Sequence, residues 1–120
     1  MNTDTILFRQ VHPSFIQAGR ITSQVFEPTP KDEGKLSVYD GDQIDAEGSY
    51  LHYTLEHESS GVMGVSHSEC TSLDLDVVAD PRPFPEHVLI DFSKFGKSGI
   101  KKKAKKLKSF ALKREWQYQP

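Results

Sequence analysis

The sequence lacks the cysteine pairs that stabilise many small secreted proteins and the long apolar segments of membrane proteins. Its single cysteine, Cys70, cannot form a disulfide within the chain, and a lone thiol is typical of proteins in the reducing cytoplasm. No stretch approaches the run of about 18 apolar residues that a membrane-spanning helix needs. The first residues also lack the basic flank and apolar run of a secretion signal. We therefore expect a cytoplasmic protein without a membrane segment.

The overall composition predicts a folded protein. Hydrophobic residues make up 36% of the 120 positions and charged residues 27%, which are ordinary values for a globular domain. A chain of this length can bury a core without disulfides or metal ions. We expect a single domain over residues 1–120.

Positive charge is scarce in most of the chain and concentrated at its end. Residues 1–93 carry five Lys or Arg against sixteen Asp or Glu, a net charge of −11. Residues 94–120 carry ten Lys or Arg against one Glu, a net charge of +9. A charge asymmetry of this size suggests that the protein binds a partner.

The basic segment contains the clearest predicted helix, over about 99–114. Ile100, Ala104, Leu107 and Ala111 recur at intervals of four, three and four residues, which places them on one face of an α-helix. Lysine fills most of the other positions. The segment is therefore expected to pack against the body through its apolar face and to present its lysines to solvent.

The expected start of this helix has an unfavourable charge distribution. Ser98 is a candidate N-cap, which would place Lys101–Lys103 in the first turn, where the helix dipole is positive. Each lysine there costs about 0.3–1 kcal/mol at low salt. Three explanations remain open: the acidic body neutralises the lysines, they form a solvated face, or an anionic partner binds them.

The rest of the chain predicts an α+β fold. A second helix is expected to begin after Asp45 as its N-cap, and 68–73 is expected to form a helical turn. Residues 116–120 are expected to form a closing strand or a docked tail. β-rich or alternating stretches predict strands over 5–11, 21–26, 36–39, 62–66, 74–78 and 87–92. We expect a mostly antiparallel or mixed sheet with about two helices packed on it.

The lysines of the basic helix form the candidate binding surface. They are Lys97, Lys101, Lys102, Lys103, Lys105, Lys106 and Lys108. The leading hypothesis is a non-enzymatic module, of antitoxin, immunity or accessory type, that binds an acidic protein partner.

Nucleic-acid binding through the same helix is the alternative, because a lysine face neutralises phosphates without reading sequence. Phe95, Phe110, Trp116 and Tyr118 are aromatic groups that could stack on bases. The acidic body would repel a long duplex, however, and only Arg82 and Arg114 lie near enough to read base edges in the bidentate manner. These features favour a protein partner.

A small enzyme is the third hypothesis. Arg9, Thr22-Ser23 and Glu69 superficially resemble the Arg–Ser–Glu order of ADP-ribosyltransferases, although the flanking motifs of that family are absent. With His12 and Tyr39 they define a possible polar site. A pocket that brings them within hydrogen-bonding reach would favour this hypothesis.

No metal or cofactor is expected. His52 and His57 are five residues apart and do not share a helix face, so they make a poor metal pair. The acidic cluster at 40–45 has its glycine in the wrong place for a calcium-binding loop and is expected to form a turn followed by an N-cap. Cys70 lies beside Glu69, which disfavours an activated thiolate, so it is expected to be buried and structural.

Most of the chain also resembles a small family of uncharacterised bacterial proteins. The resemblance lies in the segments His12–Phe15, Gly19–Arg20, Thr22–Gln24, Phe26, Pro28–Asp32, Leu36–Tyr39 and Lys103–Lys105, and in Trp116 and Tyr118. It implies a bacterial, stand-alone cytosolic protein and carries no activity or site.

Overall fold

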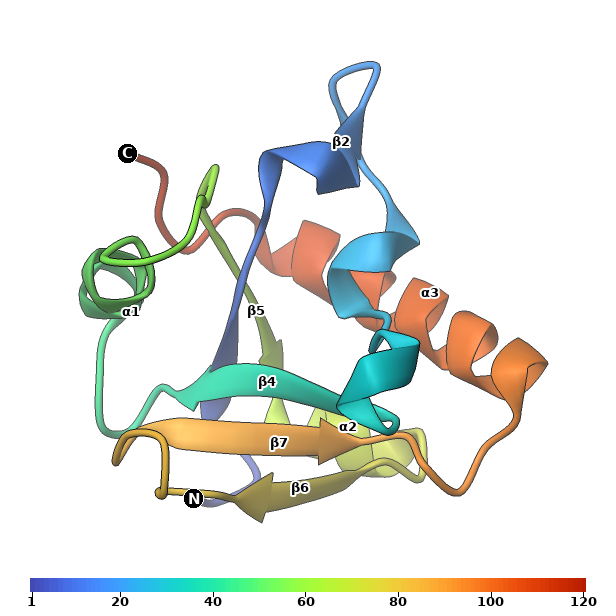
Figure 1. Ribbon diagram of the computed structural model, residues 1–120. Helices are drawn as coiled ribbons and strands as arrows, with labels where there is room; N and C mark the ends of the chain where they lie inside the picture. Colours follow the sequence, from blue (N-terminus) through green and yellow to red (C-terminus); the bar gives the residue numbers. More distant parts are fainter.

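The protein is built on a five-stranded antiparallel sheet (Figure 1). The computed structural model describes all residues from 1 to 120. In spatial order the strands are β5 (Val62–Ser66), β1 (Ile6–Gln10), β4 (Lys35–Asp40), β7 (His87–Asp91) and β6 (Asp76–Ala79). A separate hairpin contains β2 (Ile16–Gln17) and β3 (Arg20–Ile21). The helices are α1 (Ala46–Tyr53), α2 (His67–Ser72) and α3 (Lys97–Arg114), with short 3-10 helices η1 (Pro13–Phe15), η2 (Ser23–Phe26) and η3 (Pro30–Asp32). The predicted α+β class is confirmed.

The sheet has two unlike faces, because successive side chains on a strand point to opposite sides. Leu7, Val38 and Ile90 belong to the main apolar core, which α3 covers; we call this side the core face. Phe8 follows Leu7 and Tyr39 follows Val38 in the sequence, and both belong to a smaller cluster beside α1. We call this side of the sheet the pocket face. No helix of the protein is both long and apolar enough to cross a membrane.

The apolar stripe predicted for the basic helix is confirmed. Ala104, Leu107 and Ala111 are fully buried, and Ile100 packs against the same core. Burying a side chain such as Leu107 stabilises the fold by roughly 1.5–3 kcal/mol relative to leaving it exposed. α3 is therefore a structural element of the domain and not a loose basic tail.

The helix starts earlier than predicted. Gly96, and not Ser98, is the N-cap, and it contributes no side-chain hydrogen bond. The N–H of Ile100 donates to the carbonyl of Gly96 at 2.9 Å, which closes a first turn that begins at Lys97. Lys101–Lys103 therefore lie one turn further along, and the unfavourable interaction with the dipole falls mainly on Lys97, since the effect fades beyond the first turn.

The predicted strand over 21–26 is wrong beyond its first residue. β3 ends at Ile21, and the following residues form η2. Val25 and Phe26 are both fully buried in the main core. Two consecutive side chains of a regular strand point to opposite sides, so a tight turn is needed to bury both in one core.

The caps of the two shorter helices follow the sequence. Asp45 accepts a hydrogen bond from the N–H of Gly48 at 2.7 Å and caps α1, as predicted. Ser66 and Glu69 form a reciprocal capping box at the start of α2. α2 thus begins directly where β5 ends, because the N-cap Ser66 is also the last strand residue.

Residues 116–120 form a docked tail with one bridge to the sheet. Tyr118 makes an isolated antiparallel bridge to Val62, whose N–H donates to the carbonyl of Tyr118 at 2.9 Å. Gly61 precedes this bridge with φ +148°, and a Cβ there would lie only 2.7 Å from the same carbonyl oxygen. The absence of a side chain at Gly61 lets the tail approach β5 closely.

The main sheet is split near its middle. β1 pairs with β5 over five residues, and β4 pairs with β7 over five. β1 and β4 pair only at Leu7–Asp40 and Phe8–Tyr39. Beyond this short pairing the strands diverge, and Figure 1 shows β1 and β5 running at a steep angle to β4, β7 and β6. The divergence leaves an opening in the sheet.

Candidate functional site

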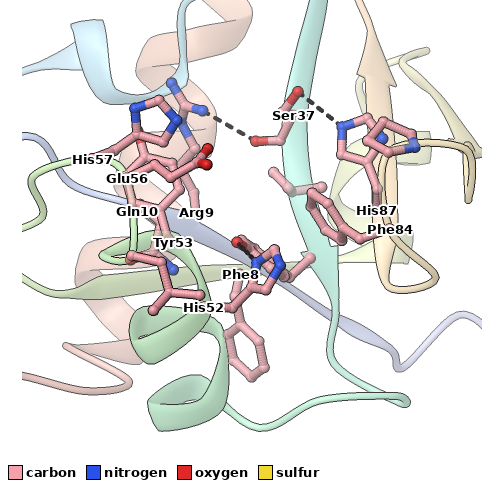
Figure 2. Close-up of a pocket in the computed structure, with 14 residues that line it drawn as sticks. Phe8, Arg9, Gln10, Ser37, His52, Tyr53, Glu56, His57, Phe84 and His87 are labelled. Atoms are coloured by element: carbon pink, nitrogen blue, oxygen red, sulfur yellow. Dashed lines mark hydrogen bonds between the residues drawn. The ribbon is translucent and has the colours of Figure 1, made fainter.

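A cavity of about 590 Å³ lies where β1 and β4 diverge (Figure 2). It is lined by 8–10 of β1, 37–39 of β4, the end of α1 with the segment up to His57, and the turn that leads into β7. Its size falls within the range of roughly 300–1,000 Å³ that is typical of small-molecule sites. No residue of α3 lines the cavity, whereas Phe8 and Tyr39 of the pocket face do.

Arg9 brings a positive charge to this cavity. Its Nε donates to the carbonyl of Val25 at 2.7 Å and its Nη1 donates to the carbonyl of Ser37 at 3.0 Å. No carboxylate forms an ion pair with the guanidinium. Burial lowers the pKa of Arg9, while the charges of Tyr53 and Asp32 oppose that shift. A guanidinium nevertheless stays protonated in proteins, so the cavity contains an unneutralised cation.

Tyr39 and His52 form a hydrogen-bonded pair at the cavity wall. The phenol oxygen lies 2.7 Å from Nδ1 of His52. Burial, assisted by the charges of Tyr53 and Glu86, raises the pKa of Tyr39 to about 12. The phenol therefore keeps its proton at neutral pH and donates it to Nδ1, which places the proton of a neutral imidazole on Nε2.

His87 uses both ring nitrogens within the protein. Nδ1 lies 2.9 Å from the carbonyl oxygen of Asp80, and Nε2 lies 3.0 Å from Oγ of Ser37. A carbonyl can only accept, so Nδ1 donates, and in the neutral ring Nε2 then accepts from the Ser37 hydroxyl. Since Ser37 also receives the hydrogen bond from Arg9, one continuous chain of hydrogen bonds joins β1, β4 and β7 beside the cavity.

Phe84 is the centre of an aromatic wall. Its ring stacks on Tyr39 with centroids 5.0 Å apart and an angle of 28°. His52 and His87 lie 4.7 Å and 5.1 Å from the same ring in tilted and edge-on arrangements. The wall combines flat apolar surface with polar edges, which is a common arrangement in ligand pockets.

Two of the five residues in the predicted polar site line the cavity. They are Arg9 and Tyr39. His12 lies at the start of η1, where its Nδ1 accepts a hydrogen bond from the N–H of Ser14 at 3.0 Å. It therefore caps a turn and does not line the cavity.

The two remaining residues of that site have partners elsewhere. Ser23 donates to Glu27 at 3.0 Å within η2 and its cap. Glu69 accepts two hydrogen bonds from Arg114, at 2.8 Å and 3.1 Å. No hydrogen bond joins the three residues that resemble the ADP-ribosyltransferase order, and only the arginine among them faces the cavity.

The ion pair of Glu69 also explains its titration. Burial alone would raise the pKa of Glu69, but the hydrogen bonds from Arg114 and Ser66 and the charge of Arg114 outweigh burial and hold the pKa below its ordinary value. The pair connects α2 to the last turn of α3, so this glutamate has a structural role.

Cys70 is fully buried, as predicted. Burial and the neighbouring charge of Glu69 raise the pKa of its thiol to about 12. A thiol in this state is a poor nucleophile at neutral pH.

Sequence reasoning missed most of the cavity wall. His52 and His57 were considered only as a metal pair, and Tyr53, Glu56 and Phe84 were not singled out. The signal that was available is the run of aromatic and ionisable side chains over 50–57.

The lysines of the predicted binding surface lie along α3 on the side away from the core. Lys97, Lys101, Lys102, Lys105 and Lys106 are exposed, and Lys103 and Lys108 are half-buried. Nζ of Lys103 lies 4.1 Å from the ring centroid of Phe95. None of the seven forms an ion pair.

The acidic body forms ion pairs with the basic segment at only two residues, Lys94 and Arg114. Lys94, before the helix, lies 4.0 Å from a carboxylate oxygen of Asp76, and Arg114, at the last turn, pairs with Glu69 at 2.8 Å. The explanation in which the body neutralises the lysines of α3 by ion pairs therefore fails.

No group of three or more His, Cys, Asp or Glu side chains is arranged to hold a metal ion. No family model, curated protein or solved structure matches the chain. The resemblance to a bacterial family that the sequence indicates therefore stays a prediction and carries no further argument.

Proposed function

We propose that the protein binds an acidic protein partner through the lysine face of α3. The observation that carries the proposal is the absence of any ion pair on seven lysines attached to a body with a net charge of −11. Like charges at neighbouring helix positions destabilise a helix by a few tenths of a kcal/mol per pair. A partner that supplies carboxylates would relieve this repulsion.

The lysines form a surface suited to an extended contact. Lys102, Lys106 and Lys113 are separated by four and seven residues and so lie in one row along the exposed side. Their Cα atoms span roughly 16 Å at 1.5 Å per residue. This length suits an acidic helix or strand of a partner, and the unpaired charge would steer its approach and raise the association rate.

The charge of the body favours a protein over a nucleic acid. A long duplex would place many phosphates near the acidic surface, and the repulsion would offset the gain from counterion release at α3. A compact acidic segment can contact the helix without that repulsion. The lone, buried thiol is consistent with a partner met in the cytoplasm, where an accessory, antitoxin or immunity factor would act.

The test is a paired charge reversal with affinity capture from native lysate. Lys102→Glu/Lys106→Glu reverses two exposed lysines of the row and leaves Lys103 on Phe95. The matched control, Arg20→Glu/Lys31→Glu, makes the same change of −4 in net charge at exposed positions outside α3. We expect the wild type and the control to retain the same protein at low salt and the α3 variant to lose it.

Nuclease treatment in parallel separates the two macromolecular classes. Capture that survives nuclease and disappears in the α3 variant supports a protein partner. Capture that nuclease abolishes supports nucleic-acid binding instead. Equal recovery by the α3 variant and the wild type contradicts any role of this face.

A further inference from the structure

We propose that the cavity on the pocket face is a binding site for a small organic anion that carries a planar ring and is roughly the size of a mononucleotide. Arg9 would hold the carboxylate or phosphate group, and the ring would lie against Phe84. No residue of α3 belongs to this site, so the inference does not depend on the partner proposed for the lysine face.

Arg9 has unused hydrogen-bond donors at the cavity. A guanidinium carries five N–H groups, of which one on Nε and one on Nη1 donate to main-chain carbonyls. Three therefore have no partner within the protein. Two N–H groups of a guanidinium in parallel match the two oxygens of a carboxylate or phosphate. An anionic ligand would satisfy donors that the fold leaves open.

The guanidinium is held in place before any ligand arrives. Its two carbonyl partners, on Val25 and Ser37, belong to two different elements, η2 and β4. Ser37 is fixed in turn by its hydroxyl, which donates to Nε2 of His87. A cation held in this way loses little side-chain freedom on binding, so more of the interaction energy remains as affinity.

The opposite wall offers a flat apolar surface. Figure 2 shows Arg9, Glu56 and His57 on one side of the cavity and Phe84 and His87 on the other, with His52 below them. The charged end and the aromatic wall therefore face each other across the opening. A ligand that spans it would carry its anionic group at one end and an apolar ring at the other.

The size of the cavity decides the size of the ligand. The cavity has a volume of about 590 Å³. One water molecule occupies about 30 Å³ in the liquid, so the cavity is much larger than a small inorganic anion. Leu55, 78% exposed, stands at the rim, where an apolar side chain gains by contacting a bound molecule. These features favour an organic ligand over free phosphate.

Glu56 is the one carboxylate among the lining residues. It is exposed and makes no ion pair with Arg9, so solvent screens its repulsion of an anion. Its removal would strengthen the field of Arg9 in the cavity. This gives a substitution that should improve anion binding without disturbing the core.

The experiment compares matched probes by two-dimensional NMR of the full-length protein. Adenosine 5′-monophosphate carries both features, adenosine lacks the charge, and ribose 5-phosphate lacks the ring. Phenylacetate and phenylacetamide repeat the comparison for a carboxylate. We expect shifts of the Arg9 side-chain N–H and of residues around Phe84 with at least one ring-bearing anion, at an affinity ten-fold or more above that of its matched compounds.

Substitutions assign the two ends of the site. Arg9→Gln should reduce the affinity for the bound anion ten-fold or more and leave that for its neutral analogue unchanged. Phe84→Ala should weaken both several-fold. Glu56→Gln should raise the affinity for the anion two- to five-fold. Arg20→Gln, an exposed arginine on the β2–β3 hairpin, is the matched control and should change nothing.

Three results would overturn the proposal. The first is the absence of shifts with both ring-bearing anions at millimolar concentration, and the second is equal affinity for anions with and without the ring. The third is unchanged anion affinity in Arg9→Gln. If Arg9→Gln does not fold, Phe84→Ala and Glu56→Gln decide the question, and unchanged affinity in both rejects the site.

Discussion

The two faces of the sheet differ in how they use their side chains. On the core face, α3 buries Ala104, Leu107 and Ala111 completely and places its charges in solvent. At the cavity, Arg9 lies partly buried without a counterion, and Phe84 remains half-covered. The core face separates buried apolar groups from exposed charged groups in the usual way, whereas a charged group lies partly buried at the cavity.

This difference suggests that the two faces have different roles, one in stability and one in binding. Close packing of apolar side chains favours stability, and the core face buries Ala104, Leu107 and Ala111 in this way. A desolvated cation and uncovered aromatic rings cost stability unless something binds them. The pocket face therefore carries the features of a binding site, and the core face carries the stability that supports it.

Leu107→Ala gives the largest effect expected from this comparison. Removal of a fully buried leucine should destabilise the protein by about 2–5 kcal/mol, through lost transfer free energy and the cavity left behind. Phe84→Ala on the pocket face should cost less than half as much, because the ring is only partly buried. Urea unfolding followed by circular dichroism measures both, and equal losses would remove the distinction between the faces.

Glu69→Gln should cost about 1–2 kcal/mol at neutral pH, because it removes a charge-assisted pair with Arg114. The pKa of Glu69 is lowered in the folded state, so its stabilisation is complete above its ordinary pKa of about 4.5. The contribution is lost as the pH falls through the lower folded value.

The difference between wild type and Glu69→Gln should therefore be constant near neutrality and shrink below about pH 4.5. Unfolding free energies measured from pH 7 to pH 3 test this dependence. A difference that grows in acid would mean that burial, and not the ion pair, dominates the titration of Glu69.

Tyr39→Phe should destabilise the protein by about 0.5–1.5 kcal/mol, the net value of one hydrogen bond. The stacking on Phe84 is kept, and only the bond to His52 is lost. The Nδ1 resonance of His52 should change in the same variant, as observed by ¹⁵N NMR. An unchanged resonance would show that the pair is not formed in solution.

Lys102→Glu/Lys106→Glu should have the smallest effect on stability, within about 0.5 kcal/mol. Both side chains are exposed and unpaired, so their reversal relieves repulsion as much as it creates it. Thermal unfolding at low and at moderate salt measures the change. A large loss would mean that the lysine face has a structural role that its contacts do not reveal.

Local patterns predicted the helices well. The spacing of Ile100, Ala104 and Leu107 specifies the buried stripe of α3, because helical periodicity depends only on neighbours along the chain. Asp45 specifies the start of α1 for the same reason. The errors arose where a local pattern fitted two structures, as in 21–26, where the consecutive burial of Val25 and Phe26 required a turn.

The sequence by itself determined the α+β class, the charge split and the amphipathic face of α3, since composition and periodicity are properties of short segments. Only the tertiary structure decided that the lysines of α3 are unpaired and that a cavity exists. The contacts that form the cavity wall join Arg9 to Ser37 across 28 positions and Ser37 to His87 across 50. They depend on the divergence of β1 and β4, which is a property of strand pairing and not of either strand alone.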